Sequence, residues 1–591
     1  MDENDMRRNF KIIFKFIWEY DKLYILFSII SIIVDGLTPA LLLLIMQKII
    51  NAIQTQDGFN TILQFVIIYI LLDLLKDIYS NFINYYNSKF EKKFELHMST
   101  KLFNKAEKLK LSDYENSNTY NVINRAQNEG GNRVITFYTS IVKIISSIIM
   151  LMTYAAILLS FRYWIIGVII LIPICKFVIE TRYNKKAYNI IYARTNEERK
   201  TWYINYLLTY GSFYKEIKIL GLFGFFINKY RILVKHFNSQ DLNLLKEKSF
   251  KSVLISIMEG IVDGFLFIYI ILLGIHGEIL IGSLLTYLNV IISCKNSITS
   301  ILMNVSQSIR ESLFIKQLFE FFNMQEEKNE GKITIEKIEE IEFIDVSYKY
   351  QNTDRYVLKN IKFKISGNEK IALIGINGSG KSTLIKLMMG FYDNYEGTIL
   401  VNKIDLERID KLSLQRRIST LFQDYIRFES TFRENISYGD ISLVDDSNKI
   451  LSIINKFKFG DMLKAFPNGL DTQLGNWFDE GINISNGQWQ KVALARAFAK
   501  NADIYFLDEP NAAMDIITEN EVLCTCKEQL ANKMAVIITH KFSDIITTVD
   551  DIIVLDKGEI KERGEHLELL NSNGLYYELF NKYKHSNLEK I

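Results

Sequence analysis

The sequence has few of the residues that stiffen or cross-link a chain. Its 591 residues include four prolines and four cysteines, and no cysteine comes before Cys175. Cys524 and Cys526 are separated by one residue, which suits neither a metal site nor a redox pair, so we expect all four cysteines to be reduced packing residues. The net charge of +2 is small for this length and gives no argument for nucleic acid as a partner.

Long apolar runs, by contrast, fill the first half of the chain. Hydrophobic residues make up 49% of the sequence, and runs of about 20 apolar residues are long enough to cross a bilayer. From about residue 325 onward, charged and turn-forming residues dominate. The chain therefore divides into a membrane half and a soluble half. Six spans are predicted, centred near 33–45, 65–75, 141–158, 165–177, 255–273 and 279–292.

Loop charges orient these predicted spans. The N-terminus and the segments 86–133 and 181–251 are rich in Lys and Arg, whereas the other three connections share a single Arg. Because positively charged loops stay on the inner side, we expect both termini and the soluble half in the cytoplasm. No cleaved signal peptide is expected. Residues 10–18 predict an amphipathic helix on the inner membrane surface, with a first turn of the first span as the alternative.

One glycine-rich segment indicates phosphate chemistry. It follows the apolar residues 371–374 and precedes a helix-forming run, and this order of strand, loop and helix forms a phosphate-binding loop. Backbone N–H groups and the helix N-terminus would surround the phosphates of a nucleoside triphosphate. Lys381 would reach the β- and γ-phosphates, and Ser382 would offer its hydroxyl to Mg²⁺. The loop reads Gly375, Ile376, Asn377, Gly378, Ser379, Gly380, Lys381, Ser382 and Thr383.

An acidic motif lies farther along the soluble half. Residues 504–507 form an apolar run that ends in Asp508 and Glu509. This is typical of a buried strand whose carboxyl end faces a ligand. Asp508 would join the Mg²⁺ shell, and Glu509 would polarise the attacking water.

With these motifs in this order, the chain resembles an ATP-binding cassette (ABC) exporter half-transporter over essentially its whole length. The resemblance implies an α-helical six-span transmembrane domain fused to an α/β P-loop nucleotide-binding domain. The corresponding boundaries are 1–320 for the transmembrane domain, 321–335 for a linker and 336–591 for the nucleotide-binding domain. It also implies ATP and Mg²⁺ as cofactors and the lipid bilayer as a partner.

The resemblance assigns roles to further residues. Tyr350 in the segment 346–350 would stack on adenine, and Gln423 would touch Mg²⁺ and respond to the membrane domain. His540 would bridge the γ-phosphate and Glu509. The segments 111–117 and 215–223 resemble the short intracellular helices that grip the nucleotide-binding domains in such exporters.

The signature motif of the family is present with one change. Ser485, Gly487 and Gln488 match it, and in the family this motif meets the ATP of the opposite subunit. Asn486 replaces its first glycine and puts a side chain near phosphate. Residues 512–515, in place of the family's dimer loop, lack its usual serine. A homodimer is favoured because the chain keeps its own catalytic side chains, and a heterodimer stays open.

Charges within the predicted spans bear on the cargo. Acidic residues lie four apart in the second and fifth spans, so each pair shares a helix face and would favour cationic cargo. Neighbouring lysines would remove that preference by neutralising them. The acidic pairs are Asp73 with Asp77 and Glu259 with Asp263, and the lysines are Lys76 and Lys295.

The region around the signature most resembles bacterial exporters of modified antimicrobial peptides. The leading interpretation is ATP-driven export of a peptide or amphipathic natural product across the bacterial cytoplasmic membrane by alternating access. One alternative is a multidrug or lipid exporter with the same machinery. Another is an ATP-gated membrane regulator or one half of an asymmetric heterodimer. Without a cysteine before Cys175, no leader-cleaving cysteine protease is expected.

Overall fold

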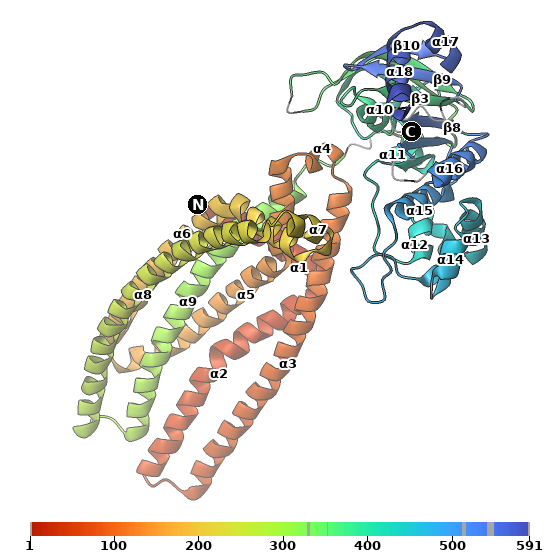
Figure 1. Cartoon of the computed structure of the whole chain (residues 1–591). Coiled ribbons are helices and arrows are strands. Elements are labelled where there is room, and N and C mark those ends of the chain that lie inside the picture. Colours follow the sequence, from red (N-terminus) through yellow and green to blue (C-terminus); the bar gives the residue numbers. More distant parts are fainter. Residues whose placement is uncertain are drawn as a thin grey trace. The chain divides into compact units, whose positions relative to one another are not determined.

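The computed structural model describes residues 3–327, 331–351, 353–510, 514, 516–539, 546 and 549–588. The chain forms two compact units (Figure 1). The first unit comprises Met1–Leu109 and Asp113–Glu326, and the second comprises Lys110–Ser112 and Glu327–Ile591. The first is helical and the second is α/β, so the predicted fold class is confirmed apart from the number of spans.

The long helices of the first unit are joined in pairs by short turns, for example at residues 55–58 and 162–163. Helices of more than 40 residues are longer than about 60 Å, about twice the thickness of a hydrocarbon core. They therefore have room to cross a membrane and to extend well beyond it. The helices are α1 (Glu3–Tyr20), α2 (Lys22–Gln54), α3 (Phe59–Glu107), α4 (Leu111–Tyr114), α5 (Ser117–Phe161), α6 (Trp164–Thr209), α7 (Gly211–Ile219), α8 (Phe223–Ile275) and α9 (Ile281–Phe322).

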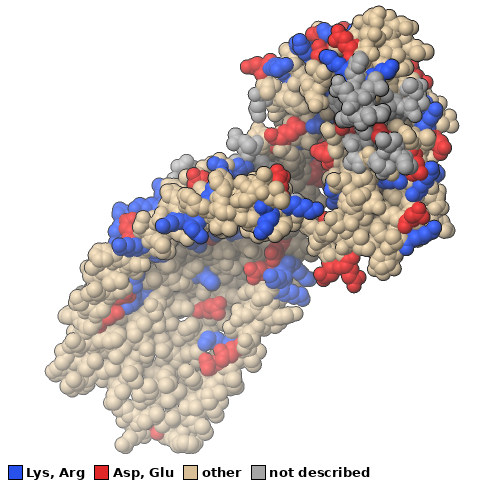
Figure 2. All heavy atoms as spheres, viewed as in Figure 1, with Lys and Arg blue, Asp and Glu red and all other residues tan. Residues whose placement is uncertain are grey.

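Four of the described helical stretches are long and apolar enough to cross a membrane: α2, residues 132–161 of α5, α6 and α8. Helices α3 and α9 cover the other two predicted spans as continuous helices, but they are not among these four. The count of six spans therefore stays a prediction. On the face shown in Figure 2, charged side chains are scarce at the end of the bundle where α8 joins α9, and they gather toward its other end.

Helix α1 is separate from the first long helix. It ends at Tyr20, and the carboxylate of Asp21 accepts hydrogen bonds from the backbone N–H groups of Leu23 and Tyr24 at the start of α2. Residues 3–20 are therefore not a first turn of α2. Helix α1 buries Ile13 and Ile17 in the helical core and leaves Trp18 exposed, which is the amphipathic pattern that the sequence predicts.

The second unit contains two sheets. The six-stranded sheet has the order β10-β9-β3-β8-β7-β6 and is parallel except for the pairing of β9 with β10. The four-stranded sheet is antiparallel with the order β2-β1-β4-β5. The strands are β1 (Glu340–Tyr348), β2 (Leu358–Ser366), β3 (Lys370–Gly375), β4 (Tyr395–Val401), β5 (Ile404–Asp405), β6 (Ile418–Leu421), β7 (Ile504–Asp508), β8 (Met534–Ile538), β9 (Asp551–Asp556) and β10 (Glu559–Gly564).

Successive residues of β3 enter two different cores. Ala372 and Ile374 belong to one core and Ile371 and Leu373 to the other, as expected for a parallel strand buried on both faces. Helices cover these cores. They are α10 (Lys381–Met388), α11 (Lys411–Arg416), α12 (Phe432–Ser437), α13 (Ser447–Lys456), α14 (Gly460–Ala465), α15 (Asn486–Ala499), α16 (Ile516–Gln529), α17 (His566–Asn571) and α18 (Leu575–Leu588).

Strand register brings the two sequence motifs together. Leu373 of β3 pairs with Ile538 of β8, and Ile538 also pairs with Asp508 of β7. The three strands are parallel, so their carboxyl ends lie at one edge of the sheet. The glycine loop and the acidic motif both begin at this edge.

Candidate functional site

The glycine loop leaves β3 at Gly375 and enters α10 at Lys381. Close packing excludes side chains at two of its positions. A Cβ on Gly375 would lie 2.2 Å from the carbonyl oxygen of Leu555, and one on Gly380 would lie 2.7 Å from a methyl group of Leu358. Gly380 also has φ +107, a left-handed conformation that favours glycine.

The side chain of Lys381 bonds to the backbone of its own loop. Its ammonium group donates hydrogen bonds to the carbonyl oxygens of Gly375 at 2.8 Å and Ile376 at 3.1 Å. Burial lowers the pKa of Lys381, whereas the charges of Asp508 and Glu509 raise it. The ammonium therefore lies where a phosphate group and the acidic motif can both interact with it.

The loop residues fit a phosphate ligand. Ser379 is 1% exposed, and its hydroxyl has no hydrogen-bond partner among the described residues. A buried polar atom of this kind is costly unless a ligand or water satisfies it. The N-terminus of α10 adds unpaired backbone N–H groups and a positive potential.

Asp508 and Glu509 form a partly buried acidic pair at the ends of the parallel strands. Burial and, to a smaller degree, the charge of Glu509 raise the pKa of Asp508 to about 6, opposed by Lys381 and a hydrogen bond from Ser382. The Ser382 hydroxyl and the Asp508 carboxylate are hard oxygen donors that fit Mg²⁺. Within the described residues no group of three or more His, Cys, Asp or Glu could hold a metal.

Glu509 has a strained backbone. Its φ is +49, in the left-handed region that non-glycine residues rarely adopt. Its backbone N–H donates to the carbonyl oxygen of Ile538 at 3.0 Å, and its own carbonyl accepts a 2.8 Å hydrogen bond from Nε2 of Gln490. Nε2 of Gln423 lies 3.4 Å from Glu509 Oε2, a long contact.

Tyr350 lies next to the glycine loop. Its hydroxyl is 3.0 Å from Oγ1 of Thr383, and its ring packs edge-on against the rings of Tyr348 and Tyr392. The side chain is half-buried. The structure thus brings Tyr350 to the loop, and its stacking on adenine stays a prediction.

The signature motif forms the start of α15. The hydroxyl of Ser485 accepts from the backbone N–H of Gln488, while Gln488 Oε1 accepts from the backbone N–H of Ser485, which makes a capping box. Asn486 is the first residue of the helix, is exposed and lacks a positive φ. The helix start therefore does not require a glycine at position 486.

Some predicted site residues lie outside the described residues. They are His540 and residues 512, 513 and 515 of the predicted dimer loop. Their roles remain predictions.

Sequence reasoning missed Gln490. It is 3% exposed on α15 and shares a helical face with Ala493, Leu494 and Ala497. A glutamine on an otherwise apolar helical face is the signal that could have identified it, because a buried polar group needs a partner.

In the membrane unit, the acidic pair of the fifth predicted span is neutralised. Lys295 on α9 contacts Glu259 at 3.0 Å and Asp263 at 2.5 Å, and Lys176 on α6 contacts Glu259 at 2.5 Å. The structure therefore supports neutralisation rather than a negative surface for cationic cargo at this pair. On α3, Lys76 lies 3.8 Å from Asp73.

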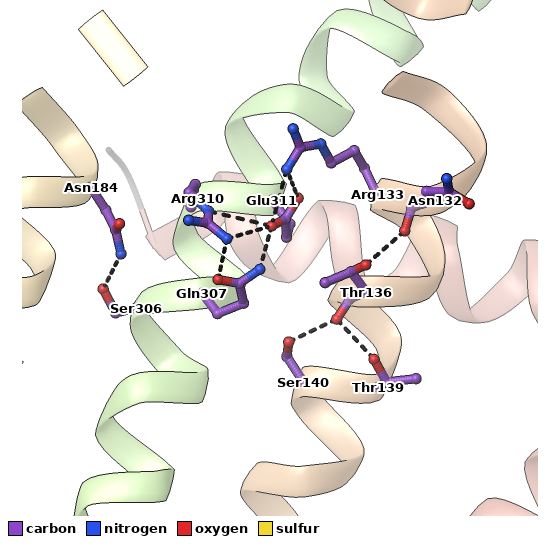
Figure 3. A network of polar contacts seen from close by, with 10 residues as sticks. All are labelled: Asn132, Arg133, Thr136, Thr139, Ser140, Asn184, Ser306, Gln307, Arg310 and Glu311. Carbon is purple, nitrogen blue, oxygen red and sulfur yellow. Dashed lines mark hydrogen bonds and ion pairs between the residues drawn. The ribbon is translucent and has the colours of Figure 1, made fainter. Parts of the chain in front are cut away.

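A second polar network joins α5, α6 and α9 (Figure 3). Glu311 of α9 is fully buried and forms a 3.0 Å ion pair with Arg133 of α5. Arg310 and Gln307 also donate hydrogen bonds to its carboxylate. Nearby, Asn184 of α6 donates a 2.9 Å hydrogen bond to Ser306. These contacts fix three helices relative to one another inside the first unit.

Residues 110–112 group with the second unit. Lys110 forms a 2.7 Å ion pair with Asp393, and Leu111 packs against the core that contains β3. Leu111 and Ser112 begin the first predicted coupling segment, 111–117. The second such segment, 215–223, contains the end of α7 and exposes two aliphatic side chains: Ile219 is 86% exposed and Leu220 58%.

Comparison with known proteins gives consistent matches. Residues 358–512 match the family model described as ABC transporter. The chain is 32% identical over 575 residues to the subtilin transport ATP-binding protein SpaT of Bacillus subtilis, covering 97% of this chain and 93% of that protein. It is 31% identical over 574 residues to the nisin transport ATP-binding protein NisT of Lactococcus lactis subsp. lactis, covering 96% and 94%.

Two further matches are less specific. An ATP-dependent lipid A-core flippase of Methylobacillus flagellatus is 34% identical over 269 residues, which is 45% of each chain. The structure of a bacterial Atm1-family ABC exporter with ATP bound aligns with a TM-score of 0.78 at 21% identity and covers 95% of this chain and 98% of that chain. This likeness shows a shared fold.

Proposed function

Because this chain belongs to the ABC transporter family, whose members couple ATP hydrolysis to transport, we propose that it exports a peptide of the lantibiotic type across the bacterial cytoplasmic membrane. The observation that carries the proposal is the end-to-end similarity to two transport proteins named for subtilin and nisin. The matches to lipid A-core flippases cover 45% to 62% of this chain, against 97% and 96% for the two peptide-transport proteins. A lipid or multidrug exporter is therefore the second candidate.

The proposed ATP site lies at the edge of the six-stranded sheet. Backbone N–H groups of residues 375–383 would hold the phosphates, with Lys381 on the β- and γ-phosphates and Tyr350 against adenine. Ser382, Asp508 and Gln423 would hold Mg²⁺, which neutralises charge on the phosphates when bound.

Glu509 is the proposed group that orients the attacking water. Its carboxylate would accept a hydrogen bond from the water as the water oxygen attacks the γ-phosphorus and ADP leaves. His540 is assigned to the γ-phosphate beside it. The strained backbone of Glu509 supports this role, because such strain persists where the surrounding structure holds a functional group in place.

The proposed active form is a homodimer. One chain carries both a phosphate loop and a signature motif, so two copies could form two complete sites across their interface. In each site, Ser485, Gly487 and Gln488 would face the nucleotide of the other copy, with the N-terminus of α15 behind them.

Coupling to the membrane unit is assigned to two short segments. Leu111 at the start of segment 111–117 packs against the core that contains β3, next to the ion pair of Lys110. Segment 215–223 offers the exposed aliphatic side chains of Ile219 and Leu220 for a similar role. Closure of the nucleotide-binding units would then turn the long helices and change which side of the membrane the cavity faces.

The proposed topology has six spans with both termini and the nucleotide-binding unit in the cytoplasm. The positive charge in segments 86–133 and 181–251 supports this orientation. The chain is a multi-pass membrane protein of the ABC exporter fold.

Peptide-stimulated ATP hydrolysis tests the proposal. The full chain in lipid nanodiscs would be assayed with nisin, with subtilin and with a lipid A preparation, using Glu509→Gln as the blank. Stimulation by a peptide but not by the lipid supports peptide export. Stimulation by the lipid alone would favour the second candidate.

A further inference from the structure

Helix α15 begins at the signature motif and is called the signature helix below. It contacts the backbone of Glu509 within the same chain. Nε2 of Gln490, in the second turn of α15, donates a 2.8 Å hydrogen bond to the carbonyl oxygen of Glu509. This bond has the geometry of a normal N–H···O hydrogen bond, whereas the side-chain contact from Gln423 is 3.4 Å long.

This contact holds an unfavourable conformation. Glu509 has φ +49, which a residue with a side chain keeps only if its neighbours enforce it. Its N–H is held by Ile538 of β8 and its C=O by Gln490 of α15. The peptide groups on both sides of the Glu509 Cα are therefore anchored, which fixes the direction in which its carboxylate leaves the backbone.

The position of Gln490 supports a specific task. Gln490 is 3% exposed, follows the buried Trp489 and lies on an apolar face of α15. Burying an amide among apolar groups costs free energy unless it forms hydrogen bonds, and the bond to Glu509 contributes to offsetting that cost.

We propose that Gln490 is a positioning residue for ATP hydrolysis: it aligns Glu509 and ties that alignment to the signature helix of the same chain. The inference rests on the proposed function, in which Glu509 orients the attacking water. It adds a physical link between two parts of the site that would serve different nucleotides in a dimer.

The link has a mechanical consequence. Helix α15 carries Ser485 and Gly487 at its N-terminus, and these residues are proposed to meet the nucleotide bound to the second copy. A helix moves as a rigid element over this short distance, so docking of that nucleotide would also set the position of Gln490. Each copy would thereby adjust its own Glu509 when its signature motif engages the other site.

The test compares two nearly isosteric variants of the full chain in nanodiscs. Gln490→Met keeps the size of the side chain but removes the donor, and Gln490→Glu presents carboxylate oxygens to the Glu509 carbonyl. Loss of one hydrogen bond should lower kcat about three- to tenfold in Gln490→Met. The kcat of Gln490→Glu should fall at least about tenfold, although glutamate resembles glutamine more closely than methionine does, because its carboxylate repels the carbonyl oxygen of Glu509. The KM for ATP should change less than about twofold in Gln490→Met, because the phosphate loop is untouched.

The matched control is Gln415→Met, on the exposed face of α11. It should leave kcat, KM and the thermal midpoint unchanged. If Gln490→Glu does not fold, the kcat and KM of Gln490→Met alone test the inference. An unchanged kcat in Gln490→Met, or a rise in KM equal to the fall in kcat, would overturn the inference while leaving the proposed function intact. If the wild type shows no turnover above Glu509→Gln, the hydrolysis proposal and this inference both fail.

Discussion

The ammonium nitrogen of Lys295 on α9 lies 3.0 Å from Oε1 of Glu259 on α8. Lys295 also contacts Asp263, and Lys176 contacts Glu259, so two lysines balance two carboxylates between three long helices. A balanced group inside the membrane unit stabilises helix packing and gives no net attraction for a cationic cargo. This group therefore gives no support for a preference for cationic cargo.

Removal of one charge from this group should destabilise the protein. Lys295→Met leaves a net negative charge between helices and should lower the free energy of unfolding by about 3–5 kcal/mol. The double variant with Asp263→Asn restores the charge balance and should recover more than half of the loss. Thermal unfolding in detergent measures both, with Lys316→Met at an exposed position of α9 as the control. Equal destabilisation in the single and double variants would contradict the charge-balance argument.

Asp508 predicts a pH dependence of activity. Burial and Glu509 raise its pKa to about 6, and in its proposed role the carboxylate must be ionised to hold Mg²⁺. The kcat/KM for ATP should therefore fall below about pH 6, which a pH profile of the free enzyme would reveal. A plateau that extends unchanged to pH 5 would show that Asp508 is not the titrating group.

The same carboxyl group predicts a pH dependence of stability. A pKa raised above the unfolded value means that the folded state binds more protons, so stability falls as pH rises through the interval from about 4 to about 6. Asp508→Asn removes this cost and should stabilise the nucleotide-free protein by up to roughly 3 kcal/mol above pH 6. The advantage should vanish near pH 4. Unfolding curves at both pH values test this, and a constant advantage would argue against the titration.

Much of the nucleotide site could be predicted from the sequence because its motifs are local. The loop from Gly375 to Thr383 and the pair Asp508 and Glu509 carry their chemistry in consecutive residues. The structure brings them to one sheet edge through β3, β8 and β7, as the parallel order of strands requires.

Contacts between distant segments could not be predicted in this way. Lys176 pairs with Glu259 across 83 residues, and Gln490 reaches a backbone carbonyl that no sequence pattern marks. Whether Asn486 is tolerated in place of the usual glycine also depends on backbone conformation. Asn486 is the first residue of α15 and lacks a positive φ, so this position does not need glycine.

Replacing Asn486 by glycine should therefore have little effect. We expect Asn486→Gly to change kcat by less than about twofold, because the wild-type residue has ordinary helix geometry and an exposed side chain. ATP hydrolysis by the purified full chain measures this. A tenfold rise in kcat would instead show that the asparagine slows ATP hydrolysis.

Arg496 predicts a specific loss of stability. Its guanidinium donates to the carbonyl of Ile426 at 2.9 Å, to the carbonyl of Asn435 at 2.9 Å and to the side chain of Asn435 at 2.8 Å. Lysine cannot reproduce this fork, so Arg496→Lys should lower the free energy of unfolding by about 2–4 kcal/mol. Denaturant unfolding measures the loss, with the exposed Arg416→Lys as the control. Equal denaturation midpoints for the wild type and Arg496→Lys would show that these three hydrogen bonds do not contribute to stability.

ATP-dependent uptake of labelled nisin into sealed proteoliposomes tests the central claim most directly. The account predicts accumulation in wild-type vesicles whose nucleotide-binding units face the added ATP, and none with Glu509→Gln. Accumulation that is equal in the two preparations, or none in either while ATP is hydrolysed, would contradict peptide export as the function of this chain.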